Sequence, residues 1–250
     1  MKRHLWWVSV TAVVLSCAAA KAVRADPNPE FAKANQNYSE GHFQEAIDGY
    51  QNLIQSGRWN ANLFYNLGNG WFRLGNFGEA ILNYERALAL DPHHPETAAN
   101  LSLVRDEARA LELKPGVLER YLGAATSMQY SIAASAAFWL ALFALTRLFY
   151  SRRRSAALIA FAVFAMAVFA GAVYALYSLE TGSKGRALAI VTGTNIEARL
   201  ATADSASSVL ALPPGSEIKV LSQRGDWIYA ALPNGLRGWI PANGARLVRR

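Results

Sequence analysis

The sequence predicts a multidomain chain with an all-α solenoid, a two-helix transmembrane hairpin and a small all-β barrel, in that order. A repeat with a period of 34 residues begins near Phe31 and predicts the solenoid, because repeats of this length fold as stacked helix pairs. Two long uncharged apolar runs predict the hairpin, and short β-rich runs between Gly and Pro residues predict the barrel. The 250 residues are thus divided among several small modules.

The net charge of +7 is unevenly distributed along the chain. The charge is +4 over residues 1–25, −5 over 26–126, +4 over 127–179 and +4 over 180–250. The densest basic cluster, Arg147 with Arg152, Arg153 and Arg154, lies between the two apolar runs and not on a folded face. We therefore exclude nucleic acid as a partner and interpret the charge as a signal of membrane topology.

Residues 1–25 have the order of a secretory signal peptide. Lys2 and Arg3 precede an apolar run, and small residues lead to a cleavage site expected after Ala25. The residues just before Cys17 also resemble a lipoprotein signal, and a retained N-terminal helix is a further alternative. Because Cys17 is the single cysteine, the mature modules are expected to hold no disulfide and no cysteine metal site.

Residues 27–60 and 61–94 align as two copies of the repeat, within a module expected over 26–112. The signature positions of the second copy hold Phe64, Leu67, Gly68, Trp71, Ala80, Tyr84, Ala87 and Pro92. In this pattern the sequence resembles the tetratricopeptide repeat family, which implies antiparallel helix pairs that stack into a solenoid.

Six of these residues are expected to pack the repeats: Gly68, Trp71, Ala80, Tyr84, Ala87 and Pro92. Gly68 and Ala80 are small where two helices cross closely, while Trp71 fills the space between neighbouring helices. Residues 97–112 are expected to form a capping helix with an apolar stripe. Two and a half repeats are near the lower limit for a stable solenoid, so we expect support from a partner, from the chain itself or from the membrane.

The tetratricopeptide resemblance implies a groove for protein partners along the first helix of each repeat. Family geometry places eight residues there: Phe31, Asn35, Tyr38, Asn62, Tyr65, Asn66, Asn69 and Arg73. Asn35 and Asn66 match asparagines with which some family members hold a C-terminal carboxylate. The basic residues of such a clamp are absent, since Phe31, Glu96 and Asn100 stand in their places. We therefore expect a polar and aromatic groove for an internal peptide segment; a merely solvated surface is the alternative.

The membrane region is expected as a linker over 113–126, a first span over 127–147, a basic turn over 148–155 and a second span over 156–179. Each apolar run has the roughly 20 residues that a helix needs to cross a bilayer. Apolar residues occupy every face, which disfavours a buried hairpin of a soluble domain. The arginines predict a cytoplasmic turn, so both soluble modules should face outward from the inner membrane, as the signal peptide also predicts.

Residues 186–250 contain five short β-rich runs with Gly and Pro turns. A Gly-closed turn at Gly215, the triplet Gly225-Asp226-Trp227 and the hairpin Gly235 to Ile240 resemble the bacterial SH3-like family. The resemblance implies binding of cell-wall glycan, a peptide or another part of the chain, without catalysis. The candidate groove residues are Trp227, Tyr229 and Trp239. We expect at least one of Trp239 and Ile240 to be core, whereas Trp227 is the better groove candidate.

The sequence offers no catalytic constellation, so we predict neither an enzyme nor a cofactor or metal site. His93 and His94 lie in a turn between helices without nearby ligand spacing, and a solvated turn is the simpler interpretation.

The domain order as a whole resembles BatE-type proteins of bacterial aerotolerance operons. This resemblance implies a scaffold in stress resistance, with von Willebrand A-domain membrane proteins and, indirectly, a MoxR-type ATPase as partners. We expect an inner-membrane adaptor. The alternatives are a sensor or anchor that binds peptidoglycan and recruits a cell-wall enzyme, or an envelope hydrolase.

Overall fold

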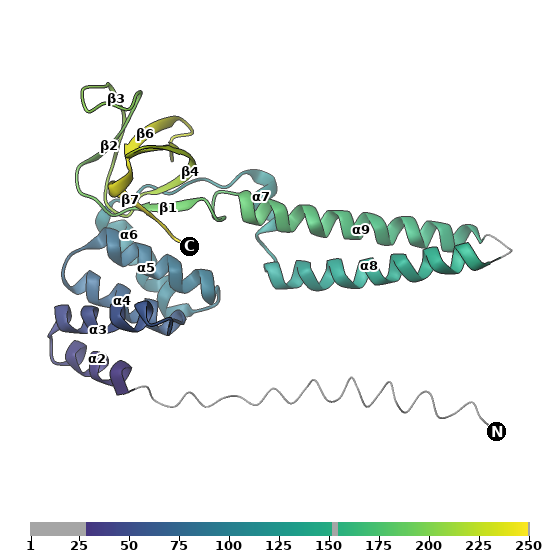
Figure 1. The fold of residues 1–250 in the computed structure, drawn as a ribbon, viewed down its shortest axis with the longest axis horizontal. Helices are drawn as coiled ribbons and strands as arrows, with labels where there is room; N and C mark the ends of the chain where they lie inside the picture. The colour runs from purple at the N-terminus through teal and green to yellow at the C-terminus, as the bar shows by residue number, and fades with distance from the viewer. Residues whose placement is uncertain (1–28, 152–154, 250) are drawn as a thin grey trace.

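The computed structural model describes residues 29–151 and 155–249. A helical module, a β-sheet module and a long helical hairpin are joined at one place, from which the hairpin projects (Figure 1). The signal-peptide prediction, with Cys17, lies outside the described residues, as do Arg152, Arg153 and Arg154 of the basic turn.

Five helices form the repeat module, and their ends follow the local sequence. They are α2 (Pro29–Ser39), α3 (Phe43–Gln55), α4 (Ala61–Arg73), α5 (Phe77–Leu90) and α6 (Pro95–Ala108). The side chains of Asn60, Asn76 and His94 each accept a hydrogen bond from a backbone N–H in the first turn of the following helix. The prediction of helical repeats is confirmed.

The repeat-packing residues lie at close helix contacts. A Cβ atom at Gly68 would lie 2.7 Å from the ring of Tyr84, so only glycine lets this ring approach α4. Ala80, Tyr84 and Ala87 have no exposed surface. Trp71 contacts the cores of both repeats and joins them. The exposed Pro92 follows the end of α5.

The last helix of the repeat module is shorter than predicted. Instead of continuing to residue 112, α6 ends at Ala108, because Arg109 adopts a left-handed conformation with φ 52°. The chain then runs along the sheet, where the N–H of Leu111 donates to the Ser216 hydroxyl and the Leu111 carbonyl accepts from Glu217 N–H. Residues predicted as a cap therefore connect the helices to the β-module.

The C-terminal module is one antiparallel sheet. Its strands are β1 (Leu188–Val191), β2 (Ile196–Arg199), β3 (Ser208–Leu212), β4 (Glu217–Arg224), β5 (Trp227–Ala231), β6 (Arg237–Pro241) and β7 (Ala245–Leu247). The spatial order is β3-β2-β6-β5-β4-β1-β7, and among the described residues the pairing ends at β3 and β7. The sheet is therefore not closed by strand pairing, and the predicted SH3-like barrel is not confirmed.

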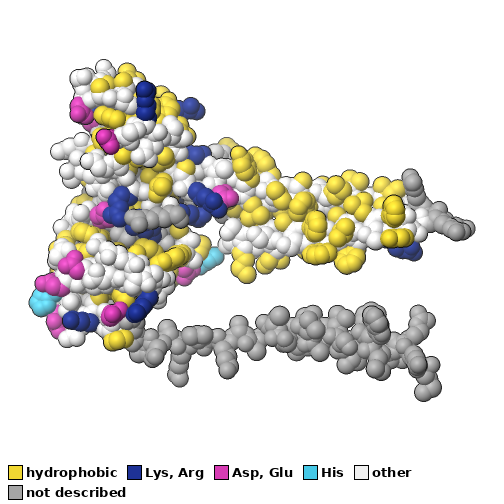
Figure 2. Space-filling view, in the orientation of Figure 1, with side chains coloured by type: hydrophobic (Ala, Val, Ile, Leu, Met, Phe, Trp, Pro, Cys, Tyr) yellow, Lys and Arg dark blue, Asp and Glu magenta, His cyan; other side chains and the backbone are white. Residues whose placement is uncertain are grey.

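The two apolar runs form the longest helices, α8 (Ser127–Tyr150) and α9 (Ala156–Thr181). Small side chains line their contact: Ala134, Ala137, Ala141 and Ala144 face Ala162, Ala165, Ala172 and Ala175, and all are buried. The larger apolar side chains point outward along most of the hairpin (Figure 2). By length and composition both helices could cross a membrane.

The sheet packs directly on the last repeat. Leu188 and Ile190 of β1 and Val248 share one buried cluster with Ile81, Tyr84, Leu101 and Val104 from α5 and α6. The turn before β4 approaches so closely that a Cβ at Gly215 would lie 2.2 Å from the Ile81 side chain. The φ of +89° at Gly215 is a second reason for glycine at this position. The repeat module and the sheet thus share a core.

A buried charge cluster lies beside this core, and Glu217 is its centre. The Glu217 side chain has no exposed surface, yet one of its oxygens contacts both Arg105 of α6 and Lys184, which follows α9. Its other oxygen accepts a hydrogen bond from the Leu113 N–H at 3.1 Å. Glu85 of α5 also pairs with Arg105 and lies 3.7 Å from Lys184. The helical module, the sheet and the segment that follows the hairpin all contribute to this cluster.

We predict that Glu217→Ala destabilises the full chain by about 3 kcal/mol or more. Removing this carboxylate leaves the positive charges of Arg105 and Lys184 without their shared partner. The matched control is Glu197→Ala, which removes a carboxylate of the same sheet that is 42% exposed and lies 3.3 Å from Arg199. We expect at most about 1 kcal/mol from this surface pair. Denaturant unfolding in detergent, followed by tryptophan fluorescence, measures both changes. Equal losses for the two variants would contradict a central role for Glu217.

Candidate protein-binding groove

Asparagine and tyrosine side chains connect α2, α4 and α6 across one face of the repeat module. Asn35 Oδ1 accepts hydrogen bonds from the Tyr50 hydroxyl at 2.8 Å and from Asn66 Nδ2 at 3.0 Å. One repeat later, Asn69 Oδ1 accepts from Tyr84 at 2.7 Å and from Asn100 Nδ2 at 3.0 Å. We call these two sets, Asn35/Tyr50/Asn66 and Asn69/Tyr84/Asn100, the asparagine–tyrosine ladder.

Burial raises the pKa of both tyrosine hydroxyls of the ladder. Desolvation, with a smaller contribution from Tyr38, raises the pKa of Tyr50 from 10.0 to about 12. Desolvation also raises the pKa of Tyr84, an effect that the nearby Asn100 side chain partly opposes. Both hydroxyls, which are protonated at neutral pH like any tyrosine, therefore stay donors into the alkaline range and hold the oxygens of Asn35 and Asn69 in fixed positions.

The ladder leaves polar groups available for a ligand. Asn35, Tyr38, Tyr50, Asn66 and Asn69 line a cleft of about 220 Å³. Within the described residues, the amide N–H groups of Asn35 and Asn69 donate no hydrogen bond, and the side-chain carbonyl of Asn66 accepts none. An extended peptide presents both carbonyl acceptors and N–H donors, so it complements this set.

The predicted groove residues fall into two groups. Asn35, Tyr38, Asn66 and Asn69 meet at the cleft, and Phe31 lies behind it with its ring 6.0 Å from that of Tyr50.

The other three residues do not line the cleft. The Arg73 guanidinium lies 4.6 Å from the centre of the Phe43 ring. Asn62 and Tyr65, on the same helix as Asn66, face His94 instead: Asn62 Oδ1 is 3.0 Å from His94 Nε2, and the Tyr65 ring is 5.1 Å from the His94 ring. The groove face thus continues from the cleft toward His94.

Sequence reasoning did not assign Tyr50, Tyr84 and His94 to this face, and it considered Asn100 only as the residue that replaces a basic clamp position. Tyr84 was predicted to pack, which it does, but its hydroxyl also orients Asn69. The signal that could have found the ladder is the period itself, because Asn35, Tyr50 and Asn66 each recur 34 residues later. His94 was interpreted as solvated, whereas its ring caps α6 and contacts Tyr65.

A second candidate surface lies on the sheet. Trp227 and Tyr229 of β5 are partly exposed, while Ile228 between them is buried. Trp239 of β6 pairs with Tyr229, and their ring centres are 4.9 Å apart. Ile240 is fully buried, so the core residue of β6 is Ile240 and the aromatic side chains share the outer face.

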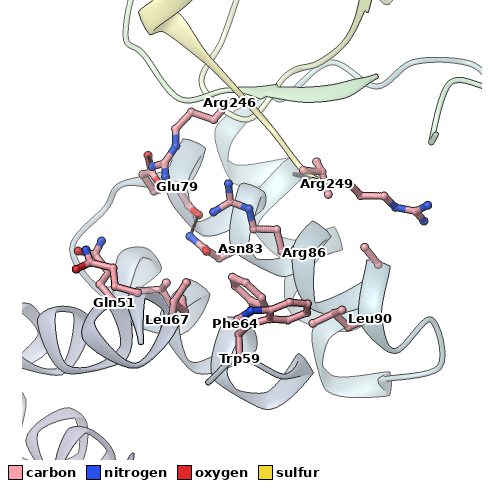
Figure 3. Close-up of a pocket in the computed structure, with 14 residues that line it drawn as sticks. Gln51, Trp59, Phe64, Leu67, Glu79, Asn83, Arg86, Leu90, Arg246 and Arg249 are labelled. Atoms are coloured by element: carbon pink, nitrogen blue, oxygen red, sulfur yellow. Dashed lines mark hydrogen bonds and ion pairs between the residues drawn. The ribbon is translucent and has the colours of Figure 1, made fainter. Parts of the chain in front are cut away.

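A larger cavity of about 640 Å³ lies between α3, α4, α5 and the C-terminal tail (Figure 3). Arg246 and Glu79 form an ion pair of 2.7 Å at its edge, and Arg86 donates to the Leu247 carbonyl at 3.1 Å (Figure 3). These contacts fix the tail against α5. Trp59, which is 53% exposed, lies at the far edge of this cavity.

Comparison with protein families identifies a tetratricopeptide repeat at residues 61–94, which correspond to α4, α5 and the turn that follows. No curated protein matches the chain significantly. Tetratricopeptide repeats are typically non-catalytic interaction modules, and no catalytic family is found. Among residues 29–151 and 155–249, no group of three or more His, Cys, Asp or Glu side chains could hold a metal ion.

We predict that alkaline pH weakens the repeat module through Tyr50. The unfolded chain releases the phenol proton near pH 10.0, whereas the folded chain holds it to about pH 12. Stabilisation by Tyr50 is therefore complete below pH 10 and is lost as the pH rises to 12, by on the order of 2 kcal/mol. Tyr50→Phe should reduce the pH dependence of unfolding over this range and leave the contribution of Tyr84 in place. Parallel curves for the variant and the parent chain would contradict the assignment.

Proposed function

We propose that this chain is a non-catalytic, membrane-anchored adaptor whose repeat module binds an extended segment of a partner protein. The tetratricopeptide repeat indicates protein–protein interaction, and the two apolar helices indicate membrane association. The observation that carries the proposal is the asparagine–tyrosine ladder, which fixes the oxygens of Asn35 and Asn69 and leaves their N–H groups free beside the cleft.

The ladder supports binding of an internal segment better than binding of a chain end. A carboxylate clamp requires cations at the groove, and Arg73 is stacked on Phe43 instead of lining the cleft. The amide donors of Asn35 and Asn69 are neutral and match the carbonyl groups of a peptide backbone. Tyr38 adds an aromatic surface for an apolar side chain of the partner.

The membrane position and the partners follow from sequence features. We propose that both soluble modules lie at the outer face of the inner membrane, since the signal peptide and the basic turn predict the same orientation. The resemblance to BatE-type proteins suggests von Willebrand A-domain membrane proteins as partners in a stress-resistance complex, with a MoxR-type ATPase acting indirectly.

A second candidate function is that of a sensor or anchor that binds peptidoglycan. The observation that favours it is the aromatic outer face of the sheet, where Trp227, Tyr229 and Trp239 are partly exposed. Flat aromatic rings supply contact area to sugars or peptides at little conformational cost.

We predict that a photo-reactive amino acid at position 38 crosslinks a partner protein in intact cells. The same probe at the exposed position 52 of α3 is the negative control, and a probe at position 239 tests the sheet. Asn66→Ala should lower the adduct yield at position 38 about tenfold, because the groove loses one hydrogen-bonding partner. Mass spectrometry of the adducts identifies what is bound.

The matched variant Asn52→Ala removes an exposed asparagine outside the cleft and should leave the yield unchanged. Unaltered melting of Asn66→Ala would exclude a folding defect. Protein adducts at position 38 that are insensitive to Asn66→Ala would contradict the groove. Wall-derived adducts at position 239 alone would favour the peptidoglycan alternative.

The topology gives a separate prediction. A reporter that is active only outside the cytoplasm should work when it is fused after Arg250, and a reporter that requires the cytoplasm should not. Neutralising Arg147 and residues 152–154 together should yield mixed orientations, because these arginines supply most of the positive-inside bias. Activity of the cytoplasmic reporter on the parent chain would reject the proposed orientation.

A further inference from the structure

The junction of the three modules contains a cavity at one end of the hairpin. The cavity has a volume of about 730 Å³, within the range of small-molecule sites. Its lining includes Thr126 and Ser127 at the start of α8 and Leu176 and Leu179 in the last turns of α9. If the hairpin spans a bilayer, as the proposed function requires, this cavity opens at the level of the lipid headgroups.

The short helix α7 (Val117–Leu122) supports this placement. It contacts α9 and connects the repeat module to α8, so it lies beside the same end of the hairpin (Figure 1). Val117 and Tyr121 are 71% and 75% exposed, and Leu118 is 52% exposed. Large apolar side chains and tyrosine are favoured at a membrane surface, where their apolar parts contact lipid. The α7 surface is therefore suited to contact with the bilayer interface.

Two of the three carboxylates that line the cavity are paired with cations. Glu85 pairs with Arg105 and Lys184, and Glu180 pairs with Arg186. Glu119 accepts hydrogen bonds from the backbone and side chain of Ser183, which are neutral, so it keeps one negative charge at the cavity.

Two arginines at the cavity have no side-chain partner among the described residues. Arg120 of α7 and Arg249 of the C-terminal tail both line it, and neither side chain has an ion pair or hydrogen bond within the described part of the chain. Both residues are exposed. Guanidinium groups bind phosphate through paired N–H donors. The two free arginines outnumber the one carboxylate without a cationic partner in the described ranges, Glu119, so the charge at this cavity favours an anion.

We propose that this cavity binds an anionic glycerophospholipid. Arg120 and Arg249 hold its phosphate, and the apolar surface of Leu176 and Leu179 contacts the first part of an acyl chain. Arginine side chains bind the phosphate of a lipid headgroup through the same charge-assisted contacts. The bound lipid would join α7, α9 and the C-terminal tail, which come from three distant parts of the sequence. This proposal rests on the membrane anchoring proposed above.

The test uses the full chain in detergent, titrated with phosphatidylglycerol or phosphatidylcholine and observed by native mass spectrometry. We expect retention of phosphatidylglycerol at concentrations at least tenfold lower than phosphatidylcholine. Arg120→Gln with Arg249→Gln should abolish this preference. Arg224→Gln with Arg237→Gln is the matched control, because both residues are exposed, lie on the sheet away from the cavity and remove the same charge. The control should retain the lipid within about twofold of the parent chain.

The proposal would be overturned if the two double variants retained phosphatidylglycerol equally. It would also be overturned if the parent chain retained phosphatidylglycerol and phosphatidylcholine equally. If the glutamine variant misfolds, Arg120→Lys with Arg249→Lys replaces it, because lysine keeps the charge. This variant should still prefer phosphatidylglycerol by at least threefold. Loss of that preference in a folded lysine variant would also overturn the proposal. If millimolar inorganic phosphate displaced the lipid, the site would be a site for free phosphate instead. Crosslinking at position 38 does not depend on this cavity, so failure here and failure of the adaptor function are distinguishable.

Discussion

The Glu217 carboxylate is the constraint on which the arrangement of the modules depends. It lies in β4 with no exposed surface, and it is neutralised by Arg105 from the repeats and Lys184 from the end of the hairpin. A buried carboxylate without partners is strongly unfavourable, so the modules cannot separate without exposing or stranding this charge. The cluster therefore links the repeat module and the sheet to the segment that follows the hairpin.

The same interface explains how so few repeats form a stable unit. A terminal repeat exposes an apolar face that a capping element must cover. Here β1 and the C-terminal Val248 cover α5 and α6. The short distance from Gly215 to Ile81 shows that the sheet packs closely on α5. Of the three sources of support expected from the sequence, the chain itself is the one observed. The β-module is thus part of the solenoid's core.

The features that the sequence could predict are those that recur. The 34-residue period predicted α2 to α5, and uninterrupted apolar composition predicted α8 and α9. The inter-module contacts have no such signal, because Arg105 and Glu217 are 112 residues apart and each is compatible with a solvated surface when considered alone. The predicted end of α6 was wrong by four residues for a related reason. The left-handed turn at Arg109 leads the chain to contacts with the sheet, and local propensity does not encode such contacts.

The groove was partly predictable because the repeat geometry places Asn35, Asn66 and Asn69 together. The position of Arg73 was not predictable, because its guanidinium lies over the ring of Phe43. The ladder also shows how one side chain can pack in the core and orient a polar neighbour. Tyr50 and Tyr84 are buried, and each uses its hydroxyl to fix one oxygen of an asparagine. Fixing that oxygen also fixes the amide plane, and hence the direction of the N–H groups, before a ligand arrives. The asparagines of the proposed groove therefore lose less side-chain entropy when a ligand binds than freely rotating amides would, and this favours a groove built on buried tyrosines.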